Sequence, residues 1–301
     1  MSAPPQATTL LTSYDALLVD LDGVVHLGPR PVPGAAEALS QARAAGLHIV
    51  YVTNNASRTA AEVAASLTSF GVDATAEEVL TSSMAAADEL AGRLPPGARV
   101  LVAGGPGLRE PVVQAGLVPV TSADDEPVAV VQGWSPDLTW ALLAEAAVAV
   151  RRGAMWIATN TDATLPSPRG PLPGNGAMVA AVAFATGTEP VAVGKPQPGL
   201  FRSAAQRAGA RRPLVIGDRL DTDIAGAGAA GFDSLLVLTG VSSPDDLVAA
   251  APPLRPTYVG HDLAALAGPA IAITGDGAAD DGLDELRARC RATWDGLQAE
   301  Q

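Results

Sequence analysis

The sequence predicts an α/β protein: a doubly wound parallel sheet with a second, smaller α/β domain inserted into it. Short apolar runs that end in polar residues alternate with alanine-rich stretches of helical length, near the start of the chain and again near its end. Such alternation requires right-handed crossovers between parallel strands. Between the two halves lie roughly a hundred residues with strands and helices of their own, a length typical of an independent domain.

The first half contains two strand–helix units. Residues 16–20 and 47–52 are short, apolar, β-compatible runs, which predict buried parallel strands. Residues 35–45 and 59–70 are predicted helices, and a glycine follows each of them, as is common past a helix end. Polar residues fall where the strands end, which is the edge at which parallel sheets bind ligands.

The remaining elements form two groups. The second half of the core is predicted to contain strands at residues 213–217 and 234–238, and the insert to contain strands at residues 99–103, 118–121, 129–132 and 155–159 and helices at residues 106–115 and 137–152. We therefore expect a discontinuous core, residues 1–83 and 187–267, and an inserted domain, residues 84–186.

A C-terminal extension, residues 268–301, follows the core. In it Leu283, Leu286, Cys290 and Trp294 are spaced three, four and four residues apart, which predicts an amphipathic helix. We expect this helix to pack on the core rather than to bind a partner.

Composition restricts the partners of the protein. The formal net charge is −13 and the isoelectric point about 4.5, so we expect no nucleic-acid partner, because an acidic surface repels the phosphate backbone. Any phosphate site must be made locally by metal, lysine and backbone amides. The single cysteine, Cys290, excludes an intramolecular disulfide. No apolar run reaches transmembrane length and residues 1–10 do not resemble a signal peptide, so we expect a cytoplasmic protein without a membrane partner.

Asp20-Leu21-Asp22-Gly23 follows the first predicted strand. Side chains two residues apart in a strand point the same way, so Asp20 and Asp22 are expected to face one pocket, where one carboxylate can attack and the other can move a proton. A carboxylate is an established nucleophile for phosphoryl transfer. The alternative, a calcium loop, needs a glutamate at its twelfth position, where this sequence has Pro31.

Two weaker segments carry groups that suit a phosphate. Thr53-Asn54-Asn55 follows the second strand, where a hydroxyl and free backbone amides can hold phosphate oxygens. Lys195, in Gly194-Lys195-Pro196, is a compact point charge suited to a phosphate and a carboxylate at once. Alone, the first segment is equally typical of a loop and the second of a surface lysine.

A fourth segment, Gly217-Asp218-Arg219-Leu220-Asp221-Thr222-Asp223, ends the strand at residues 213–217. Acidic side chains clustered at a strand end suggest Mg²⁺, which binds a few carboxylates and several waters. A helix N-terminus capped by Asp221 is the structural alternative, and both can hold at once.

In this order, with a long insert between the second and third, the four segments resemble the motifs of the haloacid dehalogenase superfamily: Asp-x-Asp, Thr/Ser, Lys and Gly-Asp-x-x-x-x-Asp. Thr53-Asn54-Asn55, Gly174-Asn175-Gly176 and Gly194-Lys195-Pro196 further resemble the subfamily with a type IIA (C2a) cap, which includes p-nitrophenyl, pyridoxal, phosphoglycolate and glycerol-3-phosphate phosphatases. The composition and the helical tail are most similar to the glycerol-3-phosphate phosphatase branch. The resemblance extends to residue 267 and implies a haloacid dehalogenase core with a C2a cap.

The resemblance implies a Mg²⁺-dependent phosphomonoesterase that forms a phosphoaspartate. Asp20 would be the nucleophile and a metal ligand, Asp22 the general acid and then base, with its backbone carbonyl on Mg²⁺, and Lys195 would neutralise charge on nucleophile and phosphate. The further implied contacts are Gly23, Thr53, Asn54, Asn55 and Arg58 with the phosphate and Asp218 and Asp223 with the metal.

The insert is expected to recognise the leaving group through its polar stretch, residues 159–176. Asn160 and Asp162 are expected to contact substrate, and Arg169 and Asn175 are further candidates, although most of the stretch is expected to be loop scaffolding. Glycerol 3-phosphate is the preferred substrate, with phosphoglycolate, pyridoxal phosphate and nucleotide monophosphates as alternatives. Caps in this group often take part in dimers, so a homodimer is a further expectation.

Other functions compete with this one. A phospho-accepting signalling module also uses an aspartate, a Thr/Ser and a lysine, but Asp22, the insert and the acidic segment favour hydrolysis. A dehalogenase of the same fold lacks the second aspartate of the first motif, and a binding-only homologue would have lost a motif, whereas none is missing. Residues 226–231 match the dinucleotide pattern Gly-x-Gly-x-x-Gly, but they do not follow a strand and are predicted to form a small-residue helix. Residues 104–107, Gly-Gly-Pro-Gly, are predicted to form a turn. His26 is predicted to have a simple loop role.

Overall fold

The protein is described by a computed structural model that covers residues 8–165, 169–275, 277 and 281–299. The chain forms two compact units. The first consists of Met1–Tyr51, Leu67–Ala74 and Phe201–Gln301, and the second of Val52–Ser66 and Thr75–Leu200. The first unit draws on three separate stretches of the chain and the second on two. The functional division into a core and a cap at residues 84–186 stays a prediction.

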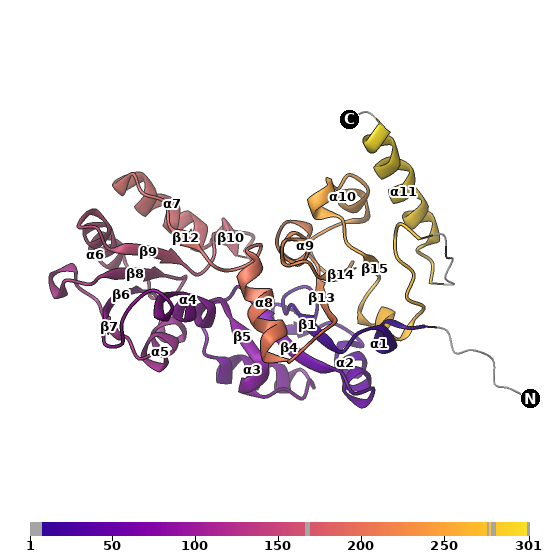
Figure 1. The fold of residues 1–301 in the computed structure, drawn as a ribbon, viewed down its shortest axis with the longest axis horizontal. Coiled ribbons are helices and arrows are strands. Elements are labelled where there is room, and N and C mark those ends of the chain that lie inside the picture. The colour runs from indigo at the N-terminus through magenta and orange to yellow at the C-terminus, as the bar shows by residue number, and fades with distance from the viewer. Residues whose placement is uncertain (1–7, 166–168, 276, 278–280, 300–301) are drawn as a thin grey trace, which may run out of the picture. The chain divides into compact units, whose positions relative to one another are not determined.

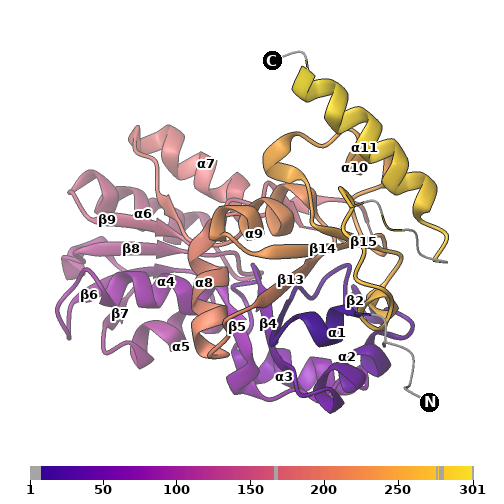
Figure 2. The same cartoon turned by 45° about the vertical axis from the view of Figure 1, so that its right-hand side comes forward.

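The first unit contains most of a six-stranded sheet with the order β15-β14-β13-β1-β4-β5 (Figures 1 and 2). Its strands are β1 (Ala16–Val19), β4 (His48–Thr53), β5 (Val79–Thr81), β13 (Pro213–Gly217), β14 (Asp233–Val237) and β15 (Tyr258–Gly260). The central strand β1 pairs in parallel with β13 and β4, which places Leu18 opposite Val215 and Val50. Every residue of β1 and β13 is buried, as expected for parallel strands covered on both faces.

The helices of this unit are short apart from the last one. They are α1 (Leu10–Ser13), α2 (Ala35–Ala44), α9 (Ala225–Ala230), α10 (Pro244–Val248) and α11 (Asp284–Ala299), and a small hairpin joins β2 (His26–Leu27) to β3 (Arg30–Pro31). Two helices, α3 (Ala60–Ser69) and α8 (Pro198–Arg207), have residues in both units. The Gly-x-Gly-x-x-Gly stretch is confirmed as helical: it lies in α9, directly after a π-helical turn, Leu220–Ile224, and not after a strand.

The second unit has a parallel sheet of its own, with the order β12-β9-β8-β6-β7 (Figure 1). Its elements are β6 (Arg99–Ala103), β7 (Val118–Val120), β8 (Ala129–Gln132), β9 (Met155–Ala158) and β12 (Val191–Ala192), a hairpin of β10 (Thr164–Leu165) and β11 (Leu172–Pro173), and helices α4 (Ser82–Ala91), α5 (Pro106–Gln114), α6 (Trp140–Arg151) and α7 (Asn175–Thr186). Alternation along β8 sends Val130 into the core beneath α6 and α7, and Val131 into the core beneath α4 and α5.

The Gly-Gly-Pro-Gly segment of this unit is not the turn that the sequence suggested. Gly105 caps α5 and Pro106 is its first helical residue, a position where proline fits because its missing N–H would have no helical partner. A Cβ on Gly107 would lie 2.6 Å from backbone atoms of Ser57 and Arg58. The glycine is therefore needed because α5 begins in backbone contact with the segment after β4.

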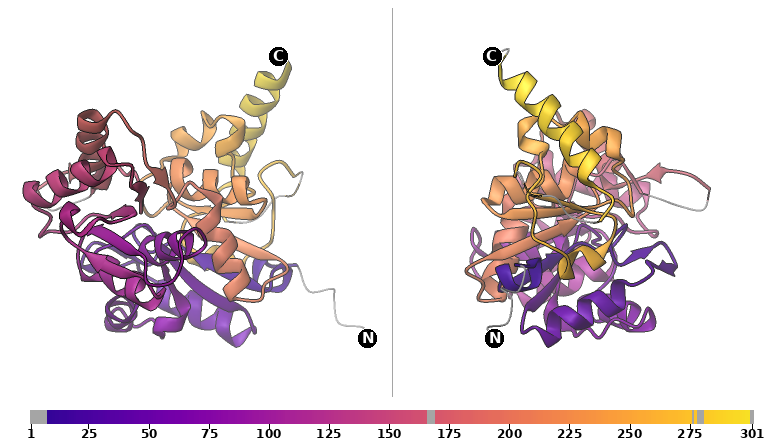
Figure 3. Two further views of the ribbon diagram at one scale, coloured as in Figure 1. Left: turned by 60° about the vertical axis from the view of Figure 1, so that its left-hand side comes forward. Right: turned by 90° about the vertical axis from the view of Figure 1, so that its right-hand side faces the viewer.

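The C-terminal extension folds onto the first unit, as predicted. Leu283, Leu286, Cys290 and Trp294 are all buried in one apolar cluster with Leu236 of β14. Figure 3 shows α11 as the yellow helix near the C-terminus. The indole nitrogen of Trp294 donates to the carbonyl of Val248 at 3.2 Å. Parts of the extension, residues 276, 278–280 and 300–301, lie outside the described residues. Among the described helices, none is both long and apolar enough to cross a membrane.

Candidate active site

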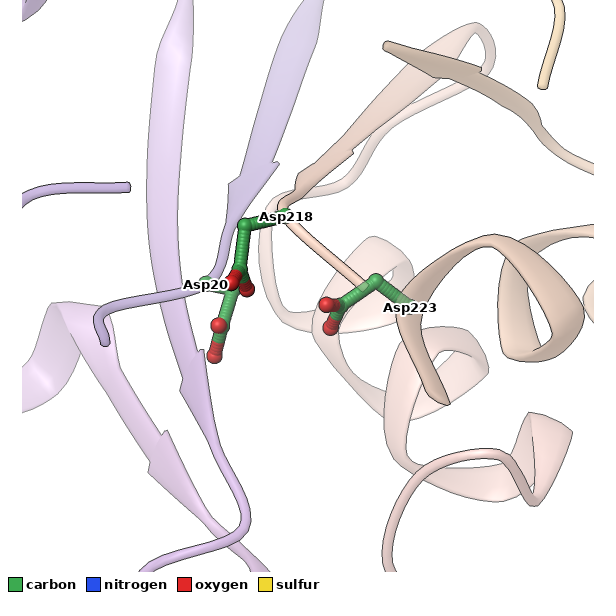
Figure 4. A group of neighbouring side chains, drawn as sticks. All are labelled: Asp20, Asp218 and Asp223. Carbon is green, nitrogen blue, oxygen red and sulfur yellow. The ribbon is translucent and has the colours of Figure 1, made fainter. Parts of the chain in front are cut away.

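Three aspartates converge at the carboxyl edge of the first unit's sheet. Asp20 directly follows β1, Asp218 directly follows the neighbouring strand β13, and Asp223 lies in the π-helical turn that comes next. One carboxylate oxygen from each lies within 4.8 Å of the others (Figure 4). The residues are 7%, 1% and 0% exposed, respectively. Parallel pairing of β1 with β13 brings the first two together, since Val19 is opposite Ile216.

Backbone groups fix the two aspartates of the fourth motif. The amide of Val241 donates to Oδ2 of Asp218 at 2.7 Å, and the amide of Arg219 donates to Oδ2 of Asp223 at 3.2 Å. Glycines make room for both carboxylates. A Cβ on Gly23 or Gly240 would collide with the Asp218 side chain, and a Cβ on Gly217 would collide with that of Asp223.

This cluster fits a small divalent cation. Three carboxylates so close together repel one another when charged, and a divalent cation between them would offset that repulsion. Carboxylate oxygens are the ligands that Mg²⁺ prefers, and with bonds of about 2.1 Å two opposite ligands lie about 4.2 Å apart, which is comparable with the observed spacing. Asp20, Asp218 and Asp223 are thus the residues that could hold a metal.

Asp22 lies beyond the end of β1, so its role in proton transfer stays a prediction. Strand β1 ends at Val19, so strand alternation does not apply to Asp22, and its side chain, 57% exposed, is not in the three-aspartate cluster. Residues 21–26 turn sharply, with the carbonyl of Leu21 accepting the amides of Val25 and His26 at 2.9 and 3.1 Å. Oδ1 of Asp22 lies 3.3 Å from Nδ1 of His26, whose ring packs on Phe70 with centroids 5.2 Å apart. An exposed carboxylate suits a group that exchanges protons with substrate and water.

The second unit holds the lysine. Lys195 is only 4% exposed, and it is the only lysine among the 19 lysine and arginine residues of the sequence. The side chain of Asn54 bonds to both backbone polar groups of this lysine. The amide of Lys195 donates to Oδ1 of Asn54 at 2.8 Å, and Nδ2 of Asn54 donates to the carbonyl of Lys195 at 3.1 Å. The same Nδ2 donates to Oδ2 of Asp162 at 3.1 Å.

The other second-unit residues named from the sequence vary in exposure. Asn160 is 5% exposed, and its side chain donates to the carbonyl of Asn54 at 2.7 Å. Thr53 is 6% exposed and accepts the amide of Asn55 at 3.1 Å. Asn55 is exposed and accepts the amide and the hydroxyl of Ser57, and Arg58 is exposed too. The structure thus brings Asn54, Asn160, Asp162 and Lys195 together, whereas the phosphate contacts of Asn55 and Arg58 stay predictions. Residues 166–168 of the polar stretch lie outside the described residues.

Three features of the site escaped the sequence analysis. Asn54 was expected to act through its amide, yet its side chain is the clamp on Lys195. The loop after β14 contributes Gly240, Val241 and Ser242, whose hydroxyl accepts the amide of Leu220 at 3.0 Å; the signal was Thr239-Gly240, polar residues at the end of another predicted strand. The third is the scarcity of lysine, which singles out Lys195 in a chain that otherwise uses arginine.

A doubly wound sheet with one aspartate after its central strand and two more after the neighbouring strand defines a hydrolase of the haloacid dehalogenase type, and the chain belongs to the haloacid dehalogenase-like hydrolase family. The model of haloacid dehalogenase-like hydrolases matches residues 17–118, and a related hydrolase-like model matches residues 192–266. The first match covers the Asp20 and Thr53 motifs, and the second covers the Lys195 and Asp218 motifs.

Its relatives are phosphatases. The chain is 48% identical to the D-glycerol 3-phosphate phosphatase of Mycobacterium tuberculosis over 97% of its own length and 89% of that protein. It is 38% identical to an acid sugar phosphatase of Staphylococcus aureus, over 84% and 96% of the two chains. Crystal structures of the Mycobacterium tuberculosis glycerol phosphate phosphatase in complex with magnesium and with calcium superpose with TM-scores of 0.92 and 0.93, covering 96% and 98% of this chain and 93% and 92% of those. The p-nitrophenyl phosphatase of Archaeoglobus fulgidus, 33% identical, gives 0.76 over 83% and 97%. The chain is accordingly a phosphoric monoester hydrolase of this family.

Proposed function

We propose that this phosphatase hydrolyses small phosphorylated metabolites with Mg²⁺ held by Asp20, Asp218 and Asp223, and that glycerol 3-phosphate is the preferred substrate. The observation that carries the proposal is the buried cluster of three carboxylates around a strand-end aspartate. The substrate rests on the 48% identity to a glycerol 3-phosphate phosphatase. Phosphoglycolate, pyridoxal phosphate and nucleotide monophosphates are the alternatives within the same chemistry.

The reaction divides into two displacements. A carboxylate oxygen of Asp20 attacks phosphorus, the ester bond to the leaving alcohol breaks, and Asp22 gives the alcohol oxygen its proton. Asp22 then takes a proton from a water molecule, whose oxygen attacks phosphorus and releases inorganic phosphate and the Asp20 carboxylate. Lys195 neutralises negative charge on nucleophile and phosphoryl group, and the metal, when bound, stabilises the charge that develops on the phosphoryl oxygens.

The phosphoryl group is common to all substrates, so discrimination must come from groups that meet the leaving alcohol. We propose that the polar stretch around Asp162 and Arg169 does this, as part of a cap comprising residues 84–186 that also limits access of water. Thr53, the amide of Asn54, Asn55, Gly23 and Arg58 are the proposed phosphate contacts. A signalling module that retains its phosphoaspartate is the alternative of another class, and the exposed Asp22 carboxylate favours turnover instead.

The test is a screen of a few dozen phosphorylated metabolites, measuring released phosphate with Mg²⁺ and with EDTA, and with Asp20→Asn as the control for contaminating activity. We expect Mg²⁺-dependent release, greatest from glycerol 3-phosphate. Preference for another metabolite would change the substrate but keep the reaction. Stoichiometric labelling of the protein without release would instead support the signalling module.

We propose a homodimer formed through α6 and α7, neighbouring helices on which Trp140 is 83% and Phe184 95% exposed. Helix α7 carries no charged residue, so two copies of an acidic chain can approach there with little repulsion. Light scattering should show a dimer that Phe184→Ser dissociates, and a monomeric wild type would rule it out. A cytoplasmic location is the accompanying expectation, which fractionation of cells would test.

A further inference from the structure

We infer that Asn175 is a positioning residue for Lys195, acting through Asn160 and Asn54, so that three asparagines far apart in sequence form one hydrogen-bonded chain ending at the lysine. The inference deepens the role proposed above for Lys195 and rests on it. The Gly174-Asn175-Gly176 motif has no part in the two displacements, and this chain of contacts gives it one.

The chain begins at the first residue of α7. Asn175 is 2% exposed, and its Nδ2 donates to the carbonyl of Asn160 at 2.7 Å and to the carbonyl of Gln132 at 3.4 Å. These two carbonyls follow or end the neighbouring strands β9 and β8. One buried amide group therefore ties the start of α7 to the carboxyl ends of two strands.

Asn160 connects Asn175 to Asn54. Its Nδ2 donates to the carbonyl of Asn54 at 2.7 Å, and its Oδ1 accepts the amide of Asp162 at 3.2 Å. The carbonyl of Asn54 also accepts the hydroxyl of Ser82 at 2.7 Å. The backbone of Asn54 is thus held by side chains from two other segments, which fixes where its own side chain can point.

Asn54 completes the chain by gripping the Lys195 peptide through both of its polar groups. A side-chain amide can donate and accept at once. Asn54 therefore bonds to the N–H and the carbonyl of one residue, Lys195, as a neighbouring strand would. Fixing the backbone of Lys195 fixes the point from which its side chain starts and so limits where the ammonium group can lie, and catalytic groups must be placed to within about 0.5 Å.

Glycines allow the segments that carry the three asparagines and Lys195 to pack closely. A Cβ on Gly194 would contact the carbonyl of Thr159 and Oδ1 of Asn54, and a Cβ on Gly176 or Gly174 would collide with the backbone of residues 161–164. The amides of Gly174 and Gly176 donate to the carbonyls of Ala163 and Asp162, both at 2.9 Å. The glycines on both sides of Asn175 and the one before Lys195 therefore serve the same close packing.

The hydrogen bonds of Asn160 define its role. Its buried amide is committed to Asn54 and Asp162, so it acts on Lys195 and not on the leaving group. Substitutions at Asn160 and Asn175 should then lower the rate with every substrate by the same factor, whereas a residue that contacts the leaving group changes preference.

The first experiment uses the single lysine. Protein labelled with ¹⁵N only at lysine gives one amide cross-peak in an NMR correlation spectrum, and that amide is the donor to Asn54. We expect Asn175→Ala and Asn160→Ala to shift this peak and to speed its hydrogen exchange, whereas Thr186→Val, which removes a hydroxyl bonded to the Val182 carbonyl on the same helix, leaves it unchanged. An unchanged peak in both asparagine variants would overturn the inference, whatever the enzyme's activity proves to be.

The second experiment is a double-mutant cycle. Asn175→Ala should lower kcat about tenfold, at the lower end of what removing outer partners of reactive groups costs, and by the same factor for glycerol 3-phosphate and p-nitrophenyl phosphate. In a Lys195→Ala background the same substitution should change kcat less than twofold, because its effect passes through the lysine. A full tenfold loss in that background, or a change of substrate preference, would contradict it. If Asn175→Ala unfolds the protein, Asn175→Asp keeps the shape, removes the donor and takes its place in both tests.

Discussion

The acidic cluster of the first unit and the lysine framework of the second solve opposite electrostatic problems. Asp20 and Asp218 are brought together by the register of two adjacent strands, and a bound cation would offset the repulsion between like charges held so close. Lys195 is a single charge, and it is held through its peptide by Asn54 rather than by the strand order of a sheet. The difference shows that sheet register suffices to gather several groups, whereas one long side chain must be oriented by tertiary hydrogen bonds.

The largest effect is expected from the nucleophile. Asp20→Asn is nearly isosteric but removes the attacking oxygen, so phosphate release should fall by roughly 10⁴-fold or more. Because one of three mutually repelling carboxylates is neutralised, the metal-free protein should be at least as stable as the wild type in thermal unfolding. A rate within tenfold of the wild type would remove Asp20 from this role.

Metal removal tests whether the carboxylates need a cation. EDTA should abolish turnover, and Mg²⁺ at 100 times its Kd should stabilise the folded wild type by about 2.7 kcal/mol, seen as a rise in Tm. Asp218→Asn should lose most of that rise. Asp221→Asn is the matched control, since Asp221 is exposed, pairs with Arg219 and lies outside the cluster. An equal loss of the Mg²⁺ effect in both variants would break the assignment.

Excess Ca²⁺ should inhibit competitively, because its looser geometry suits in-line attack poorly.

The next prediction separates rate from preference. Lys195→Ala should lower kcat/KM about 10²–10³-fold, as loss of one group that stabilises developing charge does, and equally for all substrates. Asp162→Ala should change kcat/KM unequally across phosphorylated metabolites, with a smaller effect on p-nitrophenyl phosphate. Uniform losses in Asp162→Ala, or altered preference in Lys195→Ala, would contradict this division between the two residues.

The smallest effect concerns stability alone. Arg287, whose side chain is 3% exposed, donates to Asp281 at 2.9 Å and to Asp284 at 3.1 Å, and its hydrogen bond to Asp281 holds the pKa of that carboxyl below its ordinary value. A lowered folded pKa means that this stabilisation is present above about pH 4 and is lost as the pH falls through the folded pKa. Arg287→Met should lower the free energy of unfolding by about 1–3 kcal/mol at pH 7 and by less below pH 4. The expected loss is modest because both carboxylates are at least a third exposed to solvent, which screens the ion pairs. Denaturation at both pH values, with kcat unchanged at pH 7, would confirm it, and a pH-independent cost would not.

Local patterns predicted most of the regular structure. Strands β6 and β8 have the predicted bounds, and the helix predicted at residues 137–152 begins later, at Trp140, because the Thr139 side chain caps it by accepting the amide of Leu142. Strand β5, helix α4 and helix α7 were not predicted. β5 has three residues, too few for a periodic signal, and α7 is apolar almost all round, so it shows no amphipathic period.

The site was predicted less evenly. Asp20, Asp218 and Asp223 were predicted because an acidic residue directly after a predicted strand can be recognised from its neighbours in the sequence. The structure brings the three side chains together. The alternation rule does not reach Asp22, because β1 ends at Val19, so its place beside Asp20 stays a prediction. Asn54 and Asn160 were predicted to contact phosphate and substrate, and Asn175 was a further candidate. No local rule predicts that their side chains bond to backbone groups 141, 106 and 15 residues away.

The sequence by itself determined the two parallel sheets, the family, the aspartates that meet at the strand ends and the apolar face of the last helix. Each of these depends on the order and spacing of neighbouring residues, which strand pairing and helix periodicity convert directly into shape. Only the tertiary structure decided that Lys195 is gripped by Asn54, that Asn160 and Asn175 support that grip, and that glycines 174, 176 and 194 let the segments touch. These contacts join residues from separate stretches of chain, and whether two such groups meet depends on the packing of the whole unit rather than on any segment alone.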